Sequence, residues 1–124
     1  MNEIATIGLD LAKRYFQVHA ADATGRELFR RKLRRAEVEP FLSGTPGCLV
    51  AMEARSTAHH WARVAAGHGH QVRLLPPQYV KPYVRRNKND AADAAAICEA
   101  ASRPSMRFVP VKTVEQQAVH TWYD

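Results

Sequence analysis

The sequence contains only two cysteines, Cys48 and Cys98, and no long uncharged apolar run. Two isolated cysteines form neither a disulfide framework nor a cysteine-based zinc site, so we expect small buried side chains in a reducing compartment. The lack of a long apolar run excludes a membrane-spanning helix, and the N-terminus does not have the pattern of a signal peptide. We therefore expect a cytoplasmic protein with no membrane partner.

Negative charge is the scarcer sign. The chain has 12 Asp and Glu against 18 Lys and Arg, a formal charge of +6, and an isoelectric point near 9.7. This excess of positive charge favours a polyanionic partner, with nucleic acid as the leading candidate. With 124 residues, 46% of them hydrophobic, the chain can form one domain with a substantial core.

The first third of the sequence predicts three strands. An apolar and β-branched run covers 4–10, and a second run at 15–20 alternates between apolar and polar residues. After a turn containing Gly25, residues 27–33 form a third strand, whose basic residues should face solvent at a sheet edge. Such short connections predict an antiparallel meander. A short helix over 36–42 should follow, because Pro40 fits only in the first turn of a helix.

The rest of the chain predicts alternating strands and helices. The apolar runs 48–52 and 71–75 read as buried parallel strands, separated by a helix over 58–66. The alanine-rich run 90–101 predicts another helix, which Pro104 ends. A last helix should begin near 113–117.

Four acids are candidate site residues. Asp10 and Glu53 follow predicted strands, and the carboxyl ends of parallel strands are where catalytic groups gather in α/β sheets. Asp90 and Asp93 are three residues apart and should share one face of a helix, where a divalent cation would offset their repulsion. The alternative is that Asp90 caps this helix and Asp93 interacts with its dipole.

The histidines do not have the spacing of a zinc site. His59 and His60 are adjacent and would point in different directions on a helix, so they cannot easily share one ion. We expect one of these two to line the acidic site. His68 and His70 should be solvent-facing loop residues.

A basic, aromatic segment precedes Asp90. Cations beside aromatic rings are typical of a surface that holds a phosphate backbone, although a charged run can also be a solvated face. The expected nucleic-acid-binding residues are Lys13, Tyr79, Lys81, Tyr83, Arg85, Arg86 and Lys88. A second candidate strip consists of Arg30, Arg31, Lys32, Arg34 and Arg35.

The order of elements and four motifs resemble a known family. The chain is similar to the ribonuclease H-like fold of the RuvC type. It resembles more closely the N-terminal domain of the DEDD transposases of the one-hundred-and-ten family of bacterial insertion sequences (IS110), which includes the Piv DNA invertase. The motifs are residues 7–13, 52–54 with 58–62, 75–83 and 87–94, and the resemblance covers about residues 4–111.

The resemblance implies a fold, a site and partners. It implies an α/β ribonuclease H-like domain over 1–111, with three antiparallel strands followed by parallel strands in one mixed sheet flanked by helices. Asp10, Glu53, Asp90 and Asp93 would be the catalytic acids that hold Mg²⁺ or Mn²⁺ for DNA strand cleavage and transfer. A structured guide-type RNA and a homo-oligomer of the full-length protein are further implied partners.

Two features depart from the family pattern. The loop after Glu53, residues 54–57, differs from that of relatives. The family also has a C-terminal domain with a serine thought to bond covalently to DNA, and no serine here can be assigned that role. We therefore expect 112–124 to begin a truncated C-terminal region and transposition to be incomplete without that domain. The alternative functions are a non-catalytic nucleic-acid-binding module and a metal-independent α/β protein whose acids cap helices.

Overall fold

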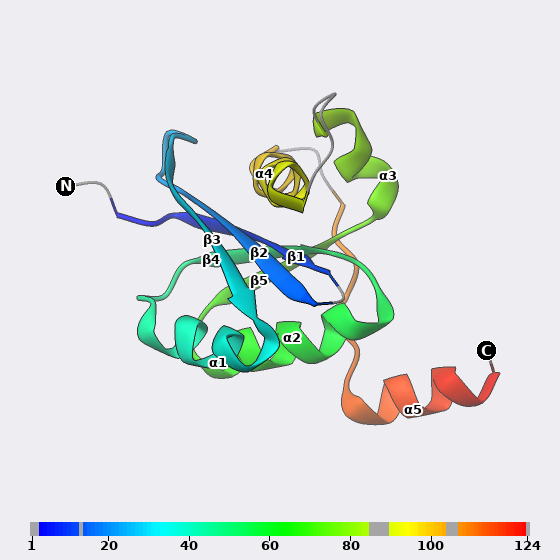
Figure 1. Cartoon of the computed structure of the whole chain (residues 1–124). Helices are drawn as coiled ribbons and strands as arrows, with labels where there is room; N and C mark the ends of the chain where they lie inside the picture. Colours follow the sequence, from blue (N-terminus) through cyan, green and yellow to red (C-terminus); the bar gives the residue numbers. More distant parts are fainter. Residues whose placement is uncertain (1–2, 13, 85–89, 104–106, 124) are drawn as a thin grey trace.

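The computed structural model describes residues 3–12, 14–84, 90–103 and 107–123, and of 90–92 and 119–123 only the backbone (Figure 1). Three strands come first, and helices and strands then alternate. The elements are β1 (Thr6–Leu11), β2 (Tyr15–Ala21), β3 (Glu27–Arg34), α1 (Arg35–Gly44), β4 (Leu49–Glu53), α2 (Ser56–Gly67), β5 (Gln71–Leu75), α3 (Pro77–Val80), the 3₁₀ helix η1 (Lys81–Tyr83), α4 (Asp90–Ala101) and α5 (Val114–Tyr123).

The five strands form one mixed sheet in the order β3-β2-β1-β4-β5. β2 pairs antiparallel with both β1 and β3, whereas β4 pairs parallel with both β1 and β5. The β2–β3 turn has Gly25 at a φ of +90°, and Asp22 accepts hydrogen bonds from Thr24 and Arg26. The bond from the Thr24 side chain lowers the pKa of Asp22. The predicted α/β fold with a mixed sheet is thus confirmed.

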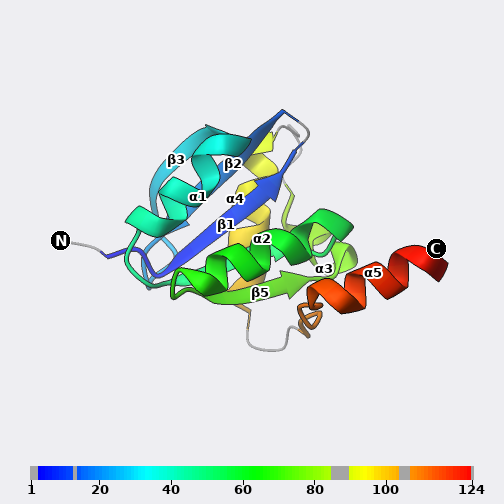
Figure 2. The same cartoon turned by 90° about the horizontal axis from the view of Figure 1, so that it is seen from below.

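Helices cover both faces of the sheet. α1 and α2 lie on one face, and α4 with α3 lies on the other (Figures 1 and 2). Alternation along each strand sends large apolar side chains to the α1–α2 face, where Phe16 meets Trp61 edge to face at 5.3 Å between ring centroids. The α4 face has a smaller core, formed by Ala51, Leu75, Val80, Ala96, Ile97, Ala100 and Ala101. Among the helices of the described ranges, none is long and apolar enough to cross a membrane.

Helix α1 is longer than predicted. It has ten residues with Pro40 in its second turn, so the expectation that Pro40 must lie in the first turn was wrong. The proline removes one backbone donor. Val38 and Leu42, both fully buried, hold the helix on the sheet, and Glu37 Oε1 accepts the Arg34 N–H at 2.7 Å at its start. Tertiary burial therefore outweighs the local cost of the proline.

His70 is buried rather than solvent-facing, which corrects the sequence-based expectation. Its Nδ1 accepts the Cys48 N–H at 3.2 Å, and its Nε2–H donates to the Leu42 carbonyl at 2.7 Å. The ring thereby joins the end of α1 to the start of β4. Burial raises the pKa of the Cys48 and Cys98 thiols to about 11, so both stay protonated at neutral pH.

The segment after residue 107 is attached to β5 and α2. Val109 forms an isolated bridge with Leu74, and the Lys112 N–H donates to Nδ1 of buried His59 at 3.0 Å. Arg63 donates to the Lys112 carbonyl and, at 2.8 Å, to the Gln117 side chain. His59 and Arg63 are one turn apart on α2, so together they satisfy both backbone groups of Lys112.

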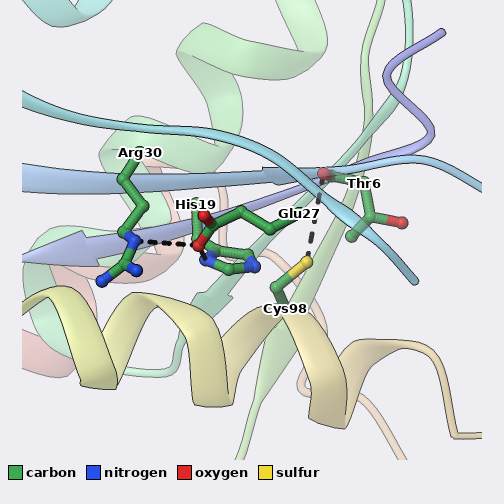
Figure 3. A network of polar contacts seen from close by, with 5 residues as sticks. All are labelled: Thr6, His19, Glu27, Arg30 and Cys98. Carbon is green, nitrogen blue, oxygen red and sulfur yellow. Dashed lines mark hydrogen bonds and ion pairs between the residues drawn. The ribbon is translucent and has the colours of Figure 1, made fainter. Parts of the chain in front are cut away.

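Helix α4 lies directly on β1 at Gly8. A Cβ added to Gly8 would overlap the Ala94 carbonyl oxygen and lie 2.8 Å from the Cys98 nitrogen, the two ends of one helical hydrogen bond. The Cys98 sulfur lies 4.0 Å from the Thr6 carbonyl oxygen (Figure 3). Only glycine permits backbones to approach this closely. Because Ala94 lies over Gly8 while Cys98 reaches Thr6, α4 runs opposite to β1.

We expect Gly8→Ala to lower the free energy of unfolding by about 1–3 kcal/mol, because the new methyl group overlaps the backbone of α4. Gly44→Ala is the matched control, since no atom lies within 4 Å of a Cβ at Gly44. Urea unfolding followed by circular dichroism measures both. Equal stability of the two variants would contradict the tight contact between α4 and β1.

Candidate acidic site

Asp10 and Glu53 lie at the same level on neighbouring parallel strands. The β1–β4 register pairs Thr6 with Leu49 and continues to Leu9 with Met52, and one further step sets Asp10 beside Glu53. Neighbouring strands are about 4.8 Å apart. Both acids alternate with side chains of the α1–α2 core, Leu9 and Met52, so both belong to the α4 face.

The first turn of α4 lies toward the same end of β1. The helix begins at Asp90, one turn before Ala94, which contacts Gly8. One helical turn advances about 5.4 Å, and two strand residues advance about 6.6 Å, so the backbone of Asp90 is near the level of Asp10. Asp93 directly precedes Ala94 and is half-buried. The side chain of Asp90 lies outside the described residues.

The described acids are in different surroundings. Asp10 is buried, with 5% of its surface exposed, and Asp93 is half-buried; both have interactions with other groups. The half-buried Glu53 has its Oε1 3.3 Å from the Arg55 guanidinium. A buried carboxylate keeps its charge only with countercharge or hydrogen bonds. Asp10 thus has interactions of the kind that a buried carboxylate needs, and Arg55 lies beside Glu53.

The donors fit a hard divalent cation. Carboxylate oxygens are the ligands that Mg²⁺ and Mn²⁺ prefer, and Asp10 and Glu53 offer them from adjacent strands. Within the side chains that the structure describes, however, no group of three His, Cys, Asp or Glu is arranged to hold a metal ion. Asp10 and Glu53 thus provide two candidate ligands, and the joint four-acid site stays a prediction.

Three of the predicted nucleic-acid-binding residues, Tyr79, Lys81 and Tyr83, lie on α3 and η1. Tyr79 is half-buried on α3, and Lys81 is exposed at the start of η1. Tyr83 is half-buried against the α4-face core, with the Arg103 guanidinium 5.3 Å from its ring centroid. The other four predicted residues, Lys13, Arg85, Arg86 and Lys88, lie outside the described residues.

Beside Gly8, a polar network lies between the sheet and α4. His19 pairs with Gly8 across β1 and β2, and Arg30 pairs with His19 across β2 and β3. Glu27 Oε1 accepts from Arg30 Nε at 2.8 Å and lies 3.4 Å from His19 Nδ1 (Figure 3). Burial lowers the pKa of His19 against the opposing effect of Glu27. The ring is therefore neutral at pH 7.

Two contributors to this site were not among the predicted residues. Gly8 lets α4 approach β1, and a glycine inside an apolar strand was the available signal for such an approach. Arg55 pairs with Glu53. It belongs to the loop that departs from the family pattern, where the sequence had no signal for a partner.

The strand order of the sheet and the positions of its acids define a class of protein. A mixed sheet of this order, with acids level on its central parallel strands, is a ribonuclease H-like α/β domain. The family model for DEDD transposases of the IS110 type, described as "Transposase", matches residues 7–123. The chain therefore belongs to this transposase family, and the resemblance drawn from its sequence is confirmed.

Individual relatives of this chain are also named as transposases. A Pseudomonas aeruginosa protein named "Probable family 20 transposase" is 58% identical over 120 residues, covering 97% of this chain and 36% of its own. The transposase for insertion sequence element IS1111A of Coxiella burnetii is 50% identical, covering 96% and 33%. The transposase for insertion sequence element IS1328 of Yersinia enterocolitica is 47% identical, covering 96% and 36%. The chain spans about a third of the length of these curated relatives.

His19 should make stability depend on pH. Because its folded-state pKa is lowered, protonation favours the unfolded chain, whose histidine pKa is about 6.5. Stability should be full above that pH and fall as the pH decreases from about 6.5 toward the lower folded-state pKa. We expect His19→Gln to flatten this fall, measured as urea midpoints between about pH 7.5 and 5.5. His60→Gln, at an exposed position, should retain it. Parallel pH profiles for wild type and His19→Gln would contradict the assignment.

Proposed function

We propose that this chain forms the phosphodiester-cleaving domain of a transposase that moves an insertion sequence. The observation that carries the proposal is the level placement of Asp10 and Glu53 on the α4 face. Membership of the transposase family supports DNA as the substrate. Such a reaction needs access to bacterial DNA, and we therefore propose the cytoplasm as its location.

We propose Asp10, Glu53, Asp90 and Asp93 as the residues that hold the metal. Two divalent cations in such a site, when bound, activate the attacking nucleophile and stabilise the leaving oxygen at a scissile phosphate. Asp10 and Glu53 lie on the neighbouring strands β1 and β4, and Gly8 allows α4 to pack closely against β1. The burial of Asp10 excludes water and strengthens its attraction to a cation.

We propose that nucleic acid is held beside this site. Tyr79 on α3 and Lys81 and Tyr83 on η1 support contact with a phosphate backbone. The sequence adds four cations to this proposed surface: Lys13, Arg85, Arg86 and Lys88. A structured RNA partner and a homo-oligomer of the full-length protein rest on the family resemblance alone.

A Mn²⁺ titration followed by thermal unfolding tests the metal site. At a Mn²⁺ concentration ten times Kd, binding adds about 1.4 kcal/mol of stability and raises Tm by about 5 °C. We expect this shift in the wild type and its loss in both Asp10→Asn and Glu53→Gln. Each variant is compared with its own metal-free melt, so a change in basal stability does not affect the result.

Glu115→Gln is the control for the loss of one negative charge, because Glu115 is exposed on α5. It should keep the full shift. If the wild type and both acid variants melt alike across the titration, the chain has no assembled metal site. The alternative, a non-catalytic nucleic-acid-binding module, would then take the place of the proposed activity.

A further inference from the structure

A row of polar residues crosses the sheet at the level of the acids. Asp10 on β1 pairs with Gln17 on β2, which pairs with Lys32 on β3, and Glu53 continues the row on β4. Paired residues of neighbouring strands project to the same face. Lys32 is two strands from Asp10, a backbone separation of about 10 Å.

Three cations gather at the β3 end of this row, and we call Arg14, Lys32 and Arg34 the basic end cluster. Arg34 pairs with Tyr15, and the Lys32 ammonium lies 4.2 Å from the centroid of the Tyr15 ring. Arg14 directly precedes Tyr15 in the turn that follows β1. All three cations are exposed, and so is Tyr15. Cations around an exposed ring can bind both the phosphates and the bases of a nucleic acid strand.

The neighbouring cations of β3 and α1 have other contacts. Arg31 lies over the Phe29 ring at 5.0 Å and the Phe41 ring at 5.5 Å, on the α1–α2 face. Arg35 lies 5.6 Å from the centroid of Phe16, which belongs to the α1–α2 core. These two cations cover aromatic side chains away from the acidic site.

Arg30 shares the α4 face, but its charge is matched by Glu27 at 2.8 Å. Figure 3 shows its guanidinium between the strands and α4. One acid also lies beside the basic end cluster, since Glu37 accepts the Arg34 backbone N–H at 2.7 Å. Three cations against this one carboxylate leave the cluster with net positive charge.

Protection of a sheet edge explains part of this charge, because β3 is an edge strand and lysine or arginine there prevents pairing with another chain. Edge protection does not require the cations to collect at one end of the strand. Lys32, Arg34 and Arg14 collect at the end where Asp10 and Glu53 lie, on or beside the same face. Their position therefore points to a ligand shared with the acidic site.

We infer that the basic end cluster holds the phosphates of the DNA strand that passes through the acidic site. The inference rests on the proposed function and adds a direction for the strand, across β2 toward β3. The separation of about 10 Å from Asp10 to Lys32 equals about three base-pair steps along the axis of a B-form duplex. A phosphate bound at the acids thus has neighbours within reach of Lys32 and Arg34.

Two double variants of the whole chain test this inference. Lys32→Gln with Arg34→Gln removes two charges from the cluster, and Arg31→Gln with Arg35→Gln removes two charges from the opposite face. Binding of a labelled single-stranded DNA is measured by fluorescence anisotropy over a range of salt concentrations, with an RNA of the same sequence in parallel. Circular dichroism checks that each double variant is folded. The single variants Lys32→Gln and Arg31→Gln, which each remove one charge, form a second matched pair.

We expect the Lys32 and Arg34 double variant, the cluster variant, to have a less negative slope of log K against log salt, by about 1.4. This change is the contribution of two phosphate contacts on a single strand. The Arg31 and Arg35 variant should retain the wild-type slope. Equal slopes for the two variants would overturn the inference, since non-specific charge would then explain binding. A change confined to RNA would overturn the assignment to DNA.

The failure of this inference is distinguishable from failure of the proposed function. The cluster variant should keep the full Mn²⁺ stabilisation, because its substitutions leave the acids intact. An unchanged DNA slope with a normal Mn²⁺ shift contradicts only the strand path. Absence of a Mn²⁺ shift in the wild type contradicts the metal-dependent function on which the path rests.

Discussion

The contact between α4 and Gly8 is the constraint on which the rest of the site depends. The helix backbone is so close to β1 that a single methyl group would overlap the Ala94 carbonyl and the Cys98 nitrogen. Since α4 runs opposite to β1, this contact also sets the position of the first turn of α4 along β1. That turn carries Asp90 and Asp93 toward the end of the strand that bears Asp10. A shift of the helix along or away from β1 would move two of the four acids relative to the other two.

The two faces of the sheet serve different purposes because their side chains differ in size. The α1–α2 face carries large residues such as Phe16, Leu9 and Met52, which fill a thick core with Trp61. The α4 face carries Gly8 and Ala51, and it meets alanines of α4. Small residues bring this helix close and leave little apolar volume. The strand positions beyond the helix on that face are then free to be polar.

Local patterns in the sequence predicted most elements of the fold but not its long-range contacts. β5 was predicted at its observed bounds, Gln71–Leu75, because its apolar residues are bounded by turn residues and prolines. The length of α1 was missed because the burial of Val38 and Leu42 compensates for Pro40. His70 was misplaced for a related reason, since its partners Cys48 and Leu42 lie more than 20 residues away. For the site, the sequence marked Asp10 and Glu53, and only the strand register set them side by side.

The central claim is that Asp10, Glu53 and the first turn of α4 converge on one divalent cation site. Addition of Mn²⁺ to the ¹⁵N-labelled chain tests it directly, because the paramagnetic ion broadens the amide signals of residues nearest to it. The account predicts selective loss of the amide signals of residues 9–11, 52–54 and 90–94 at low Mn²⁺, with those of α1 and α5 retained. Broadening that spares these segments, or that is centred on exposed acids such as Glu39 or Glu115, would contradict it.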